Sequence, residues 1–186
     1  MKISNVITLL RLLLIPLIAY LLYSKKPAYI LLSMILFGIA TITDWLDGFI
    51  ARKYRQKSAF GTFFDPIIDK TLILTIFLIF ADLNLIPMWI VIILLFRELL
   101  VTVIRQNFST KSKIIGANWM GKSKFFLQSC FIFYTQIFLF LTYNDYYSVL
   151  FNKIFIYYFA LFITIASIFY AIIFLYWHRK SVFLDF

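Results

Sequence analysis

The stretch 43–70, TDWLDGFIARKYRQKSAFGTFFDPIIDK, decides the fold because it joins the polar ends of two long apolar runs. The chain of 186 residues has only eight acidic residues, and this stretch holds four of them: Asp44, Asp47, Asp65 and Asp69. A short basic segment lies between the two acid pairs. Such a gathering needs a physical reason, because charges placed within membrane-spanning segments are costly.

The rest of the chain is strongly apolar, with 63% hydrophobic residues, 23 Phe and only 14% charged residues. A soluble domain usually has about 25% charged residues. We therefore expect the lipid bilayer to be the solvent for most of the surface, around a single membrane domain over residues 1–186. The net charge of +10 is explained by cytoplasmic loops and by anionic headgroups or phosphorylated substrates. Nucleic acid is not expected as a partner, because no basic face exists outside the loops.

The apolar runs predict an all-α polytopic membrane protein with six transmembrane helices. The expected bounds are 5–23, 28–50, 64–81, 86–106, 124–143 and 153–177. Most of these runs have the roughly 20 residues that a membrane-spanning helix needs. The first helix is expected to begin near Asn5, with Arg11 turned inward or toward the headgroups. Turn-forming residues mark breaks at 24–27, 82–87 and 143–145.

Positive charge predicts the orientation of these helices. The second loop, the fourth loop and the C-terminal tail carry ten cations: Arg52, Lys53, Arg55, Lys57, Lys111, Lys113, Lys122, Lys124, Arg179 and Lys180. The opposite loops carry only three, Lys25, Lys26 and Lys153. Because positive loops stay in the cytoplasm, we expect both termini and the clustered aspartates on the cytoplasmic side.

The spacing of the four aspartates indicates a metal site. Asp44 and Asp47 are three residues apart and Asp65 and Asp69 are four apart, so each pair shares a helix face. Two helices joined by a short loop can aim both pairs at one point. Four converging carboxylates would repel one another, and a divalent cation relieves that repulsion. Oxygen ligands favour Mg²⁺, Mn²⁺ or Ca²⁺, and two ions are plausible for four carboxylates.

Small residues and one arginine accompany the acids. Gly48, Ala51 and Gly61 remove side chains where a ligand or a facing backbone must approach closely. Arg52 is a planar cation suited to binding a phosphate. The alternative is that the acids are solvated loop residues paired with neighbouring Lys and Arg. The helical spacing and the scarcity of other acids favour the metal site.

The pattern Asp44-x2-Asp47-Gly48-x2-Ala51-Arg52-x8-Gly61-x3-Asp65-x3-Asp69 resembles the signature of the CDP-alcohol phosphatidyltransferases. The resemblance implies a membrane protein, usually a homodimer, of six helices around a polar cavity open to the cytoplasm. It implies transfer of a phosphatidyl group from a CDP-linked donor to an alcohol, with release of CMP. By position, all four aspartates would bind Mg²⁺ or Mn²⁺, and Asp69 would also be the catalytic general base. The CDP-binding residues would be Asp44, Asp47, Gly48, Ala51, Arg52 and Gly61.

Weaker resemblances concern the acceptor. Asn5-x-x-Thr8-x-x-Arg11, Arg97-Glu98 with Arg105, Gly121-Lys122-x-Lys124 and the stretch 64–70 are similar to bacterial phosphatidylglycerophosphate synthases. That subgroup implies CDP-diacylglycerol as donor, sn-glycerol 3-phosphate as acceptor and a location in the bacterial inner membrane. Candidate residues for the acceptor phosphate are Thr8, Arg11, Arg105, Lys122 and Lys124, since cations near the cytoplasmic rim could converge on a phosphate.

Structural roles unrelated to the acceptor are also open for these residues. Lys122 and Lys124 also satisfy the bias for positive cytoplasmic loops, and Arg11, Arg97 and Glu98 could form a structural ion pair within the membrane. The same reaction with another acceptor, namely inositol phosphate, serine or phosphatidylglycerol, is an alternative. An ion or proton transporter is a remote alternative, because acids within membrane helices can form relays, but the repeats and broken helices typical of transporters are not evident.

Overall fold

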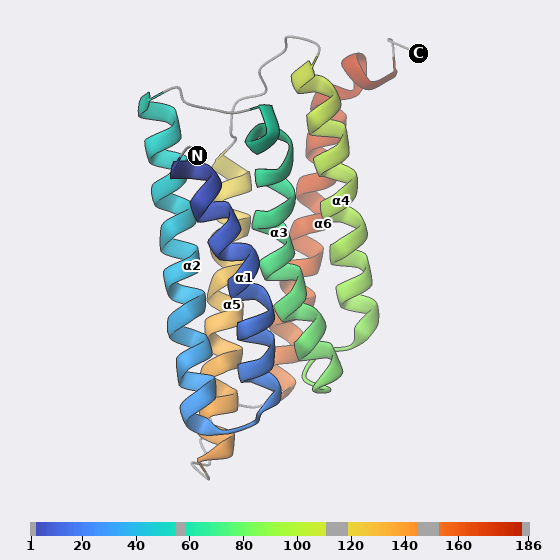
Figure 1. Cartoon of the computed structure of the whole chain (residues 1–186). Coiled ribbons are helices and arrows are strands. Elements are labelled where there is room, and N and C mark those ends of the chain that lie inside the picture. The colour runs from blue at the N-terminus through green and yellow to red at the C-terminus, as the bar shows by residue number, and fades with distance from the viewer. Residues whose placement is uncertain (1–2, 55–58, 111–118, 145–152, 184–186) are drawn as a thin grey trace.

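The structure, a computed structural model, describes the backbone of residues 3–54, 59–110, 119–144 and 153–183. Side chains are described for residues 10–43, 70–104, 123–144 and 153–176. This part of the chain contains six α-helices and no strands (Figure 1). They are α1 (Ile3–Tyr23), α2 (Pro27–Tyr54), α3 (Ala59–Asp82), α4 (Met88–Thr110), α5 (Trp119–Tyr143) and α6 (Lys153–Phe183). The all-helical fold expected from the six apolar runs is thus confirmed.

The helices begin and end close to the predicted bounds. The first helix begins at Ile3, close to the predicted start near Asn5, and so reaches a membrane-spanning length. The largest difference is at the end of α6, which continues to Phe183. In the polar stretch 43–70, α2 continues to Tyr54 and α3 begins at Ala59. Both acid pairs therefore lie within regular helix. Because residues three or four apart in a helix share one face, each pair of aspartates lies on one face of its helix.

Two tight turns at the same end of the bundle use residues with a left-handed backbone. Lys25 has a φ of 55° and Asn84 a φ of 56°. After α1, the Ser24 amide donates to the Tyr20 carbonyl at 3.1 Å, and after α3 the Leu85 amide donates to the Phe80 carbonyl at 2.9 Å. Such bonds satisfy the last carbonyls of a helix and stop it. Both turns lie at the breaks predicted from the sequence.

The six helices pack in a closed ring in the order α1–α2–α5–α6–α4–α3, and α3 also contacts α5 across the ring. Figure 1 shows α1 between α2 and α3, with α4 and α6 on the far side. The helices that carry the two acid pairs are consecutive in the chain, yet along the described part α1 packs between them. The start of α1, the end of α2, the start of α3 and the end of α6 all lie at one end of the bundle.

Aromatic side chains fill the half of the ring away from that end. Phe131 of α5 is fully buried, stacks on Phe77 of α3 with ring centroids 5.1 Å apart, and meets Phe159 of α6 edge-on at 5.4 Å. Between α2 and α5, the Gln136 side-chain amide donates to the Ser33 hydroxyl at 3.3 Å. This half of the ring therefore has a packed aromatic core that also contains one buried polar pair.

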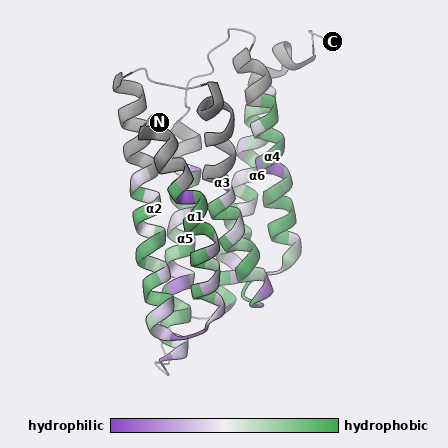
Figure 2. Cartoon of the chain, in the orientation of Figure 1, coloured by the Kyte–Doolittle hydropathy of each residue, from purple (hydrophilic) through white to green (hydrophobic). Residues whose placement is uncertain are grey.

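Large apolar side chains cover the outside of the described helices, and Figure 2 shows these helices as mainly hydrophobic. Examples are Leu13, Phe96, Phe126 and Phe169, each with 64–68% of its surface exposed. Within the described residues, Ser123–Tyr143 and Lys153–Tyr176 are long and apolar enough to cross a membrane, and Leu10–Tyr23 and Pro27–Thr43 are shorter apolar helices. A surface of this kind fits an apolar solvent.

Candidate active site

The acid signature lies at the end of the bundle where α2 ends and α3 begins. Asp44 and Asp47 lie in the last three turns of α2, and Asp65 and Asp69 lie in the first three turns of α3. The structure describes only the backbone of these four aspartates and of Gly48, Ala51, Arg52 and Gly61. The common convergence of the carboxylates on a metal therefore stays a prediction.

Next to this signature, one buried carboxylate joins three helices. Glu98 of α4 accepts a hydrogen bond from its neighbour Arg97, whose Nη1 lies 2.8 Å from Oε1. Lys124 of α5 forms an ion pair with the same oxygen. Lys70 of α3 lies 3.7 Å from the other oxygen, Oε2. Lys70 directly follows Asp69, so this cluster continues the signature along α3.

Two further side chains complete the cluster. The Lys70 ammonium donates to the Thr102 hydroxyl, and that hydroxyl donates to the backbone carbonyl of Glu98 at 2.6 Å. The Arg97 guanidinium lies over the ring of Tyr170 from α6, 4.9 Å from its centroid. Cation–π contacts of this kind stabilise a partly desolvated arginine. We call Lys70, Arg97, Glu98, Thr102 and Lys124 the cation cluster.

Cations outnumber acids among the ion pairs that the structure describes in the cation cluster. Its described ion pairs set three cations against one carboxylate. The side chains of Arg97 and Glu98 are 6% exposed and that of Lys124 is 13% exposed, whereas 32% of Lys70 is exposed. Arg97 and Lys124 have little access to solvent, and a desolvated cation is costly unless an anion compensates it. The exposed part of Lys70 could contact an anion such as a phosphate monoester, which carries about two negative charges near neutral pH.

The cluster contains only part of the predicted acceptor site. Lys124 belongs to it, and the Arg97–Glu98 pair suggested as a structural alternative is present. Arg11 is buried in α1 with 3% of its surface exposed. The side chains of Thr8, Arg105 and Lys122 lie outside the described residues, although all three positions are helical, in α1, α4 and α5.

Lys70 and Thr102 are not among the site residues predicted from the sequence. Lys70 lies in the stretch 64–70 that carries part of the resemblance, without an assigned role. A cation directly after the second acid pair, inside an apolar helix, was the available signal. For Thr102 the only signal was its position four residues after Glu98, on the same helix face.

Comparison with known proteins identifies the family. Residues 1–180 match the sequence profile described as CDP-alcohol phosphatidyltransferase. The chain belongs to the CDP-alcohol phosphatidyltransferase family. Nearly the whole bundle, with the acid signature and the cation cluster, lies within the matched region.

Several bacterial members of this family are similar to the chain. A probable phosphatidylglycerophosphate synthase from Mycobacterium tuberculosis is 38% identical over 131 residues, covering 69% of this chain and 62% of that protein. A CDP-diacylglycerol–glycerol-3-phosphate 3-phosphatidyltransferase from Bacillus subtilis is 35% identical over 139 residues, covering 68% of this chain and 72% of that protein. A Salmonella choleraesuis protein of the same name is 31% identical over 128 residues. The similarity to the mycobacterial protein thus spans less than two thirds of its length.

The donor set for a metal in this CDP-alcohol phosphatidyltransferase fits a hard divalent cation. Among residues 10–43, 70–104, 123–144 and 153–176, no three His, Cys, Asp or Glu side chains gather. The four aspartates of the signature offer carboxylate oxygens alone, which suits Mg²⁺ or Mn²⁺ better than Zn²⁺. Asp44, Asp47, Asp65 and Asp69 are therefore the residues that could hold the metal.

Proposed function

We propose that the protein transfers a phosphatidyl group from CDP-diacylglycerol to sn-glycerol 3-phosphate, giving phosphatidylglycerophosphate and CMP in phospholipid biosynthesis. Family membership supports a CDP-linked donor. The observation that supports the choice of acceptor is the cation cluster, because it gathers Lys70, Arg97 and Lys124 directly beside the acid signature, and cationic donors of this kind bind phosphate. A phosphorylated alcohol offers such a group, whereas serine brings no phosphate.

The signature supplies the donor half of the proposed site. Asp44, Asp47, Asp65 and Asp69 would hold one or two Mg²⁺ or Mn²⁺ ions. Bound there, the ions would neutralise the pyrophosphate of the donor and the charge that develops on CMP. The CDP group would be bound by Gly48, Ala51, Arg52 and Gly61, together with the first two aspartates. Arg52 offers a fork of N–H donors for a phosphate, and the small residues leave room for it.

The cation cluster and the predicted acceptor residues supply the other half. Lys70 and Lys124 would bind the acceptor phosphate, and Thr8, Arg11, Arg105 and Lys122 are the additional candidates. Lys70 is the most exposed cation of the cluster, and it follows Asp69 directly. A phosphate held by Lys70 would therefore keep the acceptor hydroxyl within reach of the proposed base. Charge-assisted hydrogen bonds of this type are about twice as strong as neutral ones.

The proposed reaction is a single displacement at the β-phosphorus of the donor. The acceptor hydroxyl oxygen forms a bond to that phosphorus while Asp69 takes the hydroxyl proton. The bond between the β-phosphorus and the bridging oxygen breaks, and CMP leaves with that oxygen and its electron pair. The diacylglycerol chains can stay in the bilayer during the reaction, and the soluble acceptor comes from the cytoplasm.

A reconstituted assay tests this proposal. Purified protein receives CDP-diacylglycerol, Mg²⁺ and one acceptor at a time from glycerol 3-phosphate, inositol phosphate, serine and phosphatidylglycerol. CMP release and the mass of the new lipid are measured. We expect CMP and phosphatidylglycerophosphate with glycerol 3-phosphate alone. CMP release only with another acceptor would show that glycerol 3-phosphate is not the acceptor. Ion flux through liposomes, with no CMP released from any acceptor, would instead favour a transporter.

Asp69→Asn provides the matched variant for this assay. We expect turnover to fall by at least about 100-fold, since general-base catalysis contributes about 10²–10⁴-fold. Asp82→Asn makes the same chemical change in an exposed residue at the other end of α3 and should leave turnover unchanged. Equal activity of the two variants would remove Asp69 from the mechanism.

We also propose six membrane spans, a bacterial inner-membrane location and a cytoplasmic active site in a homodimer. The apolar outer surface, the excess of cations at one end of the bundle and the bacterial relatives support the location. The homodimer is supported only by the family resemblance.

A further inference from the structure

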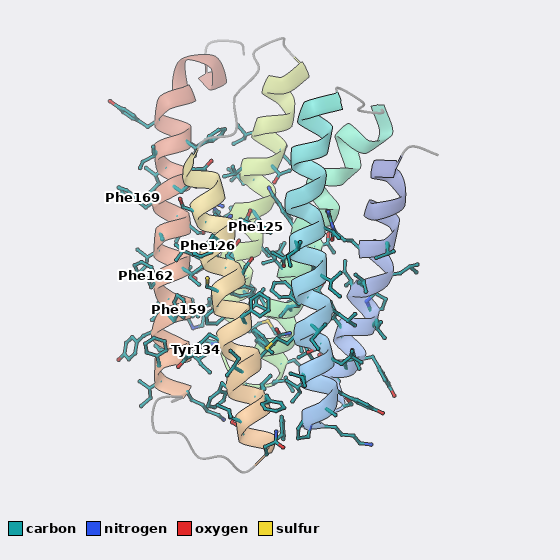
Figure 3. All side chains as sticks on the ribbon, turned by 90° about the vertical axis from the view of Figure 1, so that its left-hand side faces the viewer. Phe125, Phe126, Tyr134, Phe159, Phe162 and Phe169 are labelled. Atoms are coloured by element: carbon teal, nitrogen blue, oxygen red, sulfur yellow. The ribbon has the colours of Figure 1, made fainter. Side chains whose placement is uncertain are left out.

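A pocket opens on the outside of the bundle between α5 and α6. Its volume is about 280 Å³, and it is lined by Ser123, Lys124, Leu127, Ile163, Ala166, Phe169, Tyr170 and Ile173. Figure 3 shows α5 and α6 side by side, with the labelled aromatic residues of both helices distributed along this side of the bundle. Ser123 and Phe169 are exposed, so the pocket can be reached from the lipid side.

The sequence explains why the gap occurs in only half of the contact between α5 and α6. Away from the cation cluster, Tyr134 packs against Phe155 and Phe159 with ring centroids 5.1 and 6.3 Å apart, and these rings fill the space between the helices. Toward the cluster, Ala166 and Ser123 are the small members of the lining. Small side chains at a helix contact leave unfilled volume when the facing residues are not larger to compensate.

One wall of the pocket is cationic while the rest is apolar. Lys124 lines the pocket and also forms the ion pair with Glu98. Tyr170 lines it as well and lies under the Arg97 guanidinium. The pocket therefore ends at the cation cluster, whose described ion pairs have more cations than acids. A ligand with an anionic head and a long apolar chain matches both parts.

We propose that this pocket binds an anionic diacyl phospholipid of the surrounding bilayer, with its phosphate at Lys124 and Ser123 and one acyl chain along the groove. The groove follows α6 from Ile163 to Ile173, a rise of about 15 Å at 1.5 Å per residue, which accommodates much of an acyl chain. The phosphate lies at the end of α5 that is expected to face the cytoplasm. It competes with Glu98 for Lys124, so the bound lipid is linked to the cation cluster.

Charge complementarity selects this occupant over a neutral lipid or a partner helix. A neutral acyl chain alone would fill the apolar lining but would leave Lys124 without an additional anion. A helix of a second protein copy would need more space than the pocket volume of about 280 Å³, since a helix is about 10 Å wide with its side chains. Lys124 is also proposed above as a ligand of the acceptor phosphate, so the lipid phosphate and the acceptor phosphate would compete for this ammonium.

Native mass spectrometry of the detergent-solubilised full chain tests the proposal, without donor, acceptor or metal. The protein is titrated with phosphatidylglycerol and with phosphatidylcholine of identical acyl chains. We expect one tightly retained phosphatidylglycerol and weaker retention of phosphatidylcholine. Lys124→Gln should weaken phosphatidylglycerol binding about fivefold, as expected for one cation beside an anionic headgroup, and leave phosphatidylcholine unchanged. Equal retention of both lipids by the unmodified chain would overturn the charge argument.

Two variants fill the pocket from opposite walls. Ala166→Trp from α6 and Leu127→Phe from α5 should each abolish the retained lipid. Ile165→Trp makes the same bulky change at the neighbouring position, which is 62% exposed and outside the lining, and should retain the lipid. Variants are compared only when they elute as a single species with a cooperative melting curve, and the second filling variant serves if the first does not fold.

Two outcomes would overturn the pocket assignment. Retention of the lipid by both filling variants would exclude the groove as its site. Displacement of phosphatidylglycerol by stoichiometric CDP-diacylglycerol, with a raised donor KM in both filling variants, would make the pocket part of the donor site. Because binding is read without any reaction, failure of the lipid proposal can be distinguished from failure of the proposed transferase activity.

Discussion

Glu98 is the residue that holds the cation cluster together. Its two carboxylate oxygens face Lys70, Arg97 and Lys124, which come from three different helices. The carboxylate therefore has a structural effect, because it links α3, α4 and α5 inside the bundle. It also has an electrostatic effect, because its negative charge reduces the repulsion among three neighbouring cations.

Replacement of Glu98 should expose this structural effect. Glu98→Gln removes the acid shared by Arg97, Lys124 and the partly exposed Lys70, and removing one partner of a buried ion pair costs about 3–5 kcal/mol. We expect a loss of about 3 kcal/mol in the free energy of unfolding for Glu98→Gln, measured by denaturant titration in detergent. Lys124→Gln should cost less, since Glu98 keeps Lys70 and Arg97.

The double variant separates coupling from independent effects. Glu98→Gln with Lys124→Gln should cost at least about 1 kcal/mol less than the two single costs added together, because contacting charges are not additive. Ile42→Val, an exposed position on α2, is the control and should add its small cost independently. Strict additivity of the Glu98 and Lys124 costs would contradict the ion pair.

At the scale of elements, Gly38 of α2 lies at the contact between α2 and α5, where it faces Phe133. A Cβ added at Gly38 would lie 3.5 Å from Cζ of Phe133, which is an ordinary van der Waals distance. Phe133 also meets the neighbouring Phe37 edge-on, with centroids 5.1 Å apart. Gly38→Ala should therefore fit, and it should stabilise the protein by about 0.5–1 kcal/mol because Gly is unfavourable within a helix.

Gly38→Leu should have the opposite effect, because its additional carbons meet the Phe133 ring. Overpacking of this kind costs about 1–3 kcal/mol. Ala28→Leu adds similar bulk at an exposed position of α2 and serves as the control. Thermal unfolding of the three variants in one detergent checks the order Gly38→Ala, Ala28→Leu, Gly38→Leu. A Gly38→Leu variant as stable as Ala28→Leu would show that α2 and α5 can move apart at little cost.

The helices could be predicted from the sequence, but their order in the ring could not. Long apolar runs define where helices lie, and Lys25 and Asn84 occur at breaks recognisable from their neighbours. The outer faces are as apolar as the core, because lipid does not select polar residues as water does. Hydrophobic pattern therefore could not reveal that α1 packs between α2 and α3.

Helix packing also limits how much of the candidate site could be predicted from the sequence. Residues close in sequence on one helix, such as Arg97 and Glu98, could be paired from spacing alone. The partnership of Glu98 with Lys70 and Lys124 depends on how α3, α4 and α5 pack, which no local pattern encodes. The aspartate signature was recognisable because both acid pairs repeat within single helices, where spacing determines the face.

At the scale of the whole molecule, the ends of the bundle differ in charge. The ends of α2 and α6 and the starts of α3 and α5 lie at the end rich in Lys and Arg, and the turns after α1 and α3 lie at the other end. Because cations resist translocation, the first end should face the cytoplasm. This orientation also suits the proposed chemistry, since a soluble phosphorylated acceptor would then reach the cation cluster directly.

Cysteine accessibility tests this orientation in a chain whose Cys130 is replaced by Ser. A membrane-impermeant maleimide is applied to intact cells carrying Lys26→Cys, Asp82→Cys or Arg179→Cys. Lys26 and Asp82 are exposed near the turns after α1 and α3, and Arg179 lies in the last turns of α6. We expect the first two to be labelled directly and the third only after the membrane is permeabilised. The reverse pattern would place the signature outside the cell and would separate the cation cluster from a cytoplasmic acceptor.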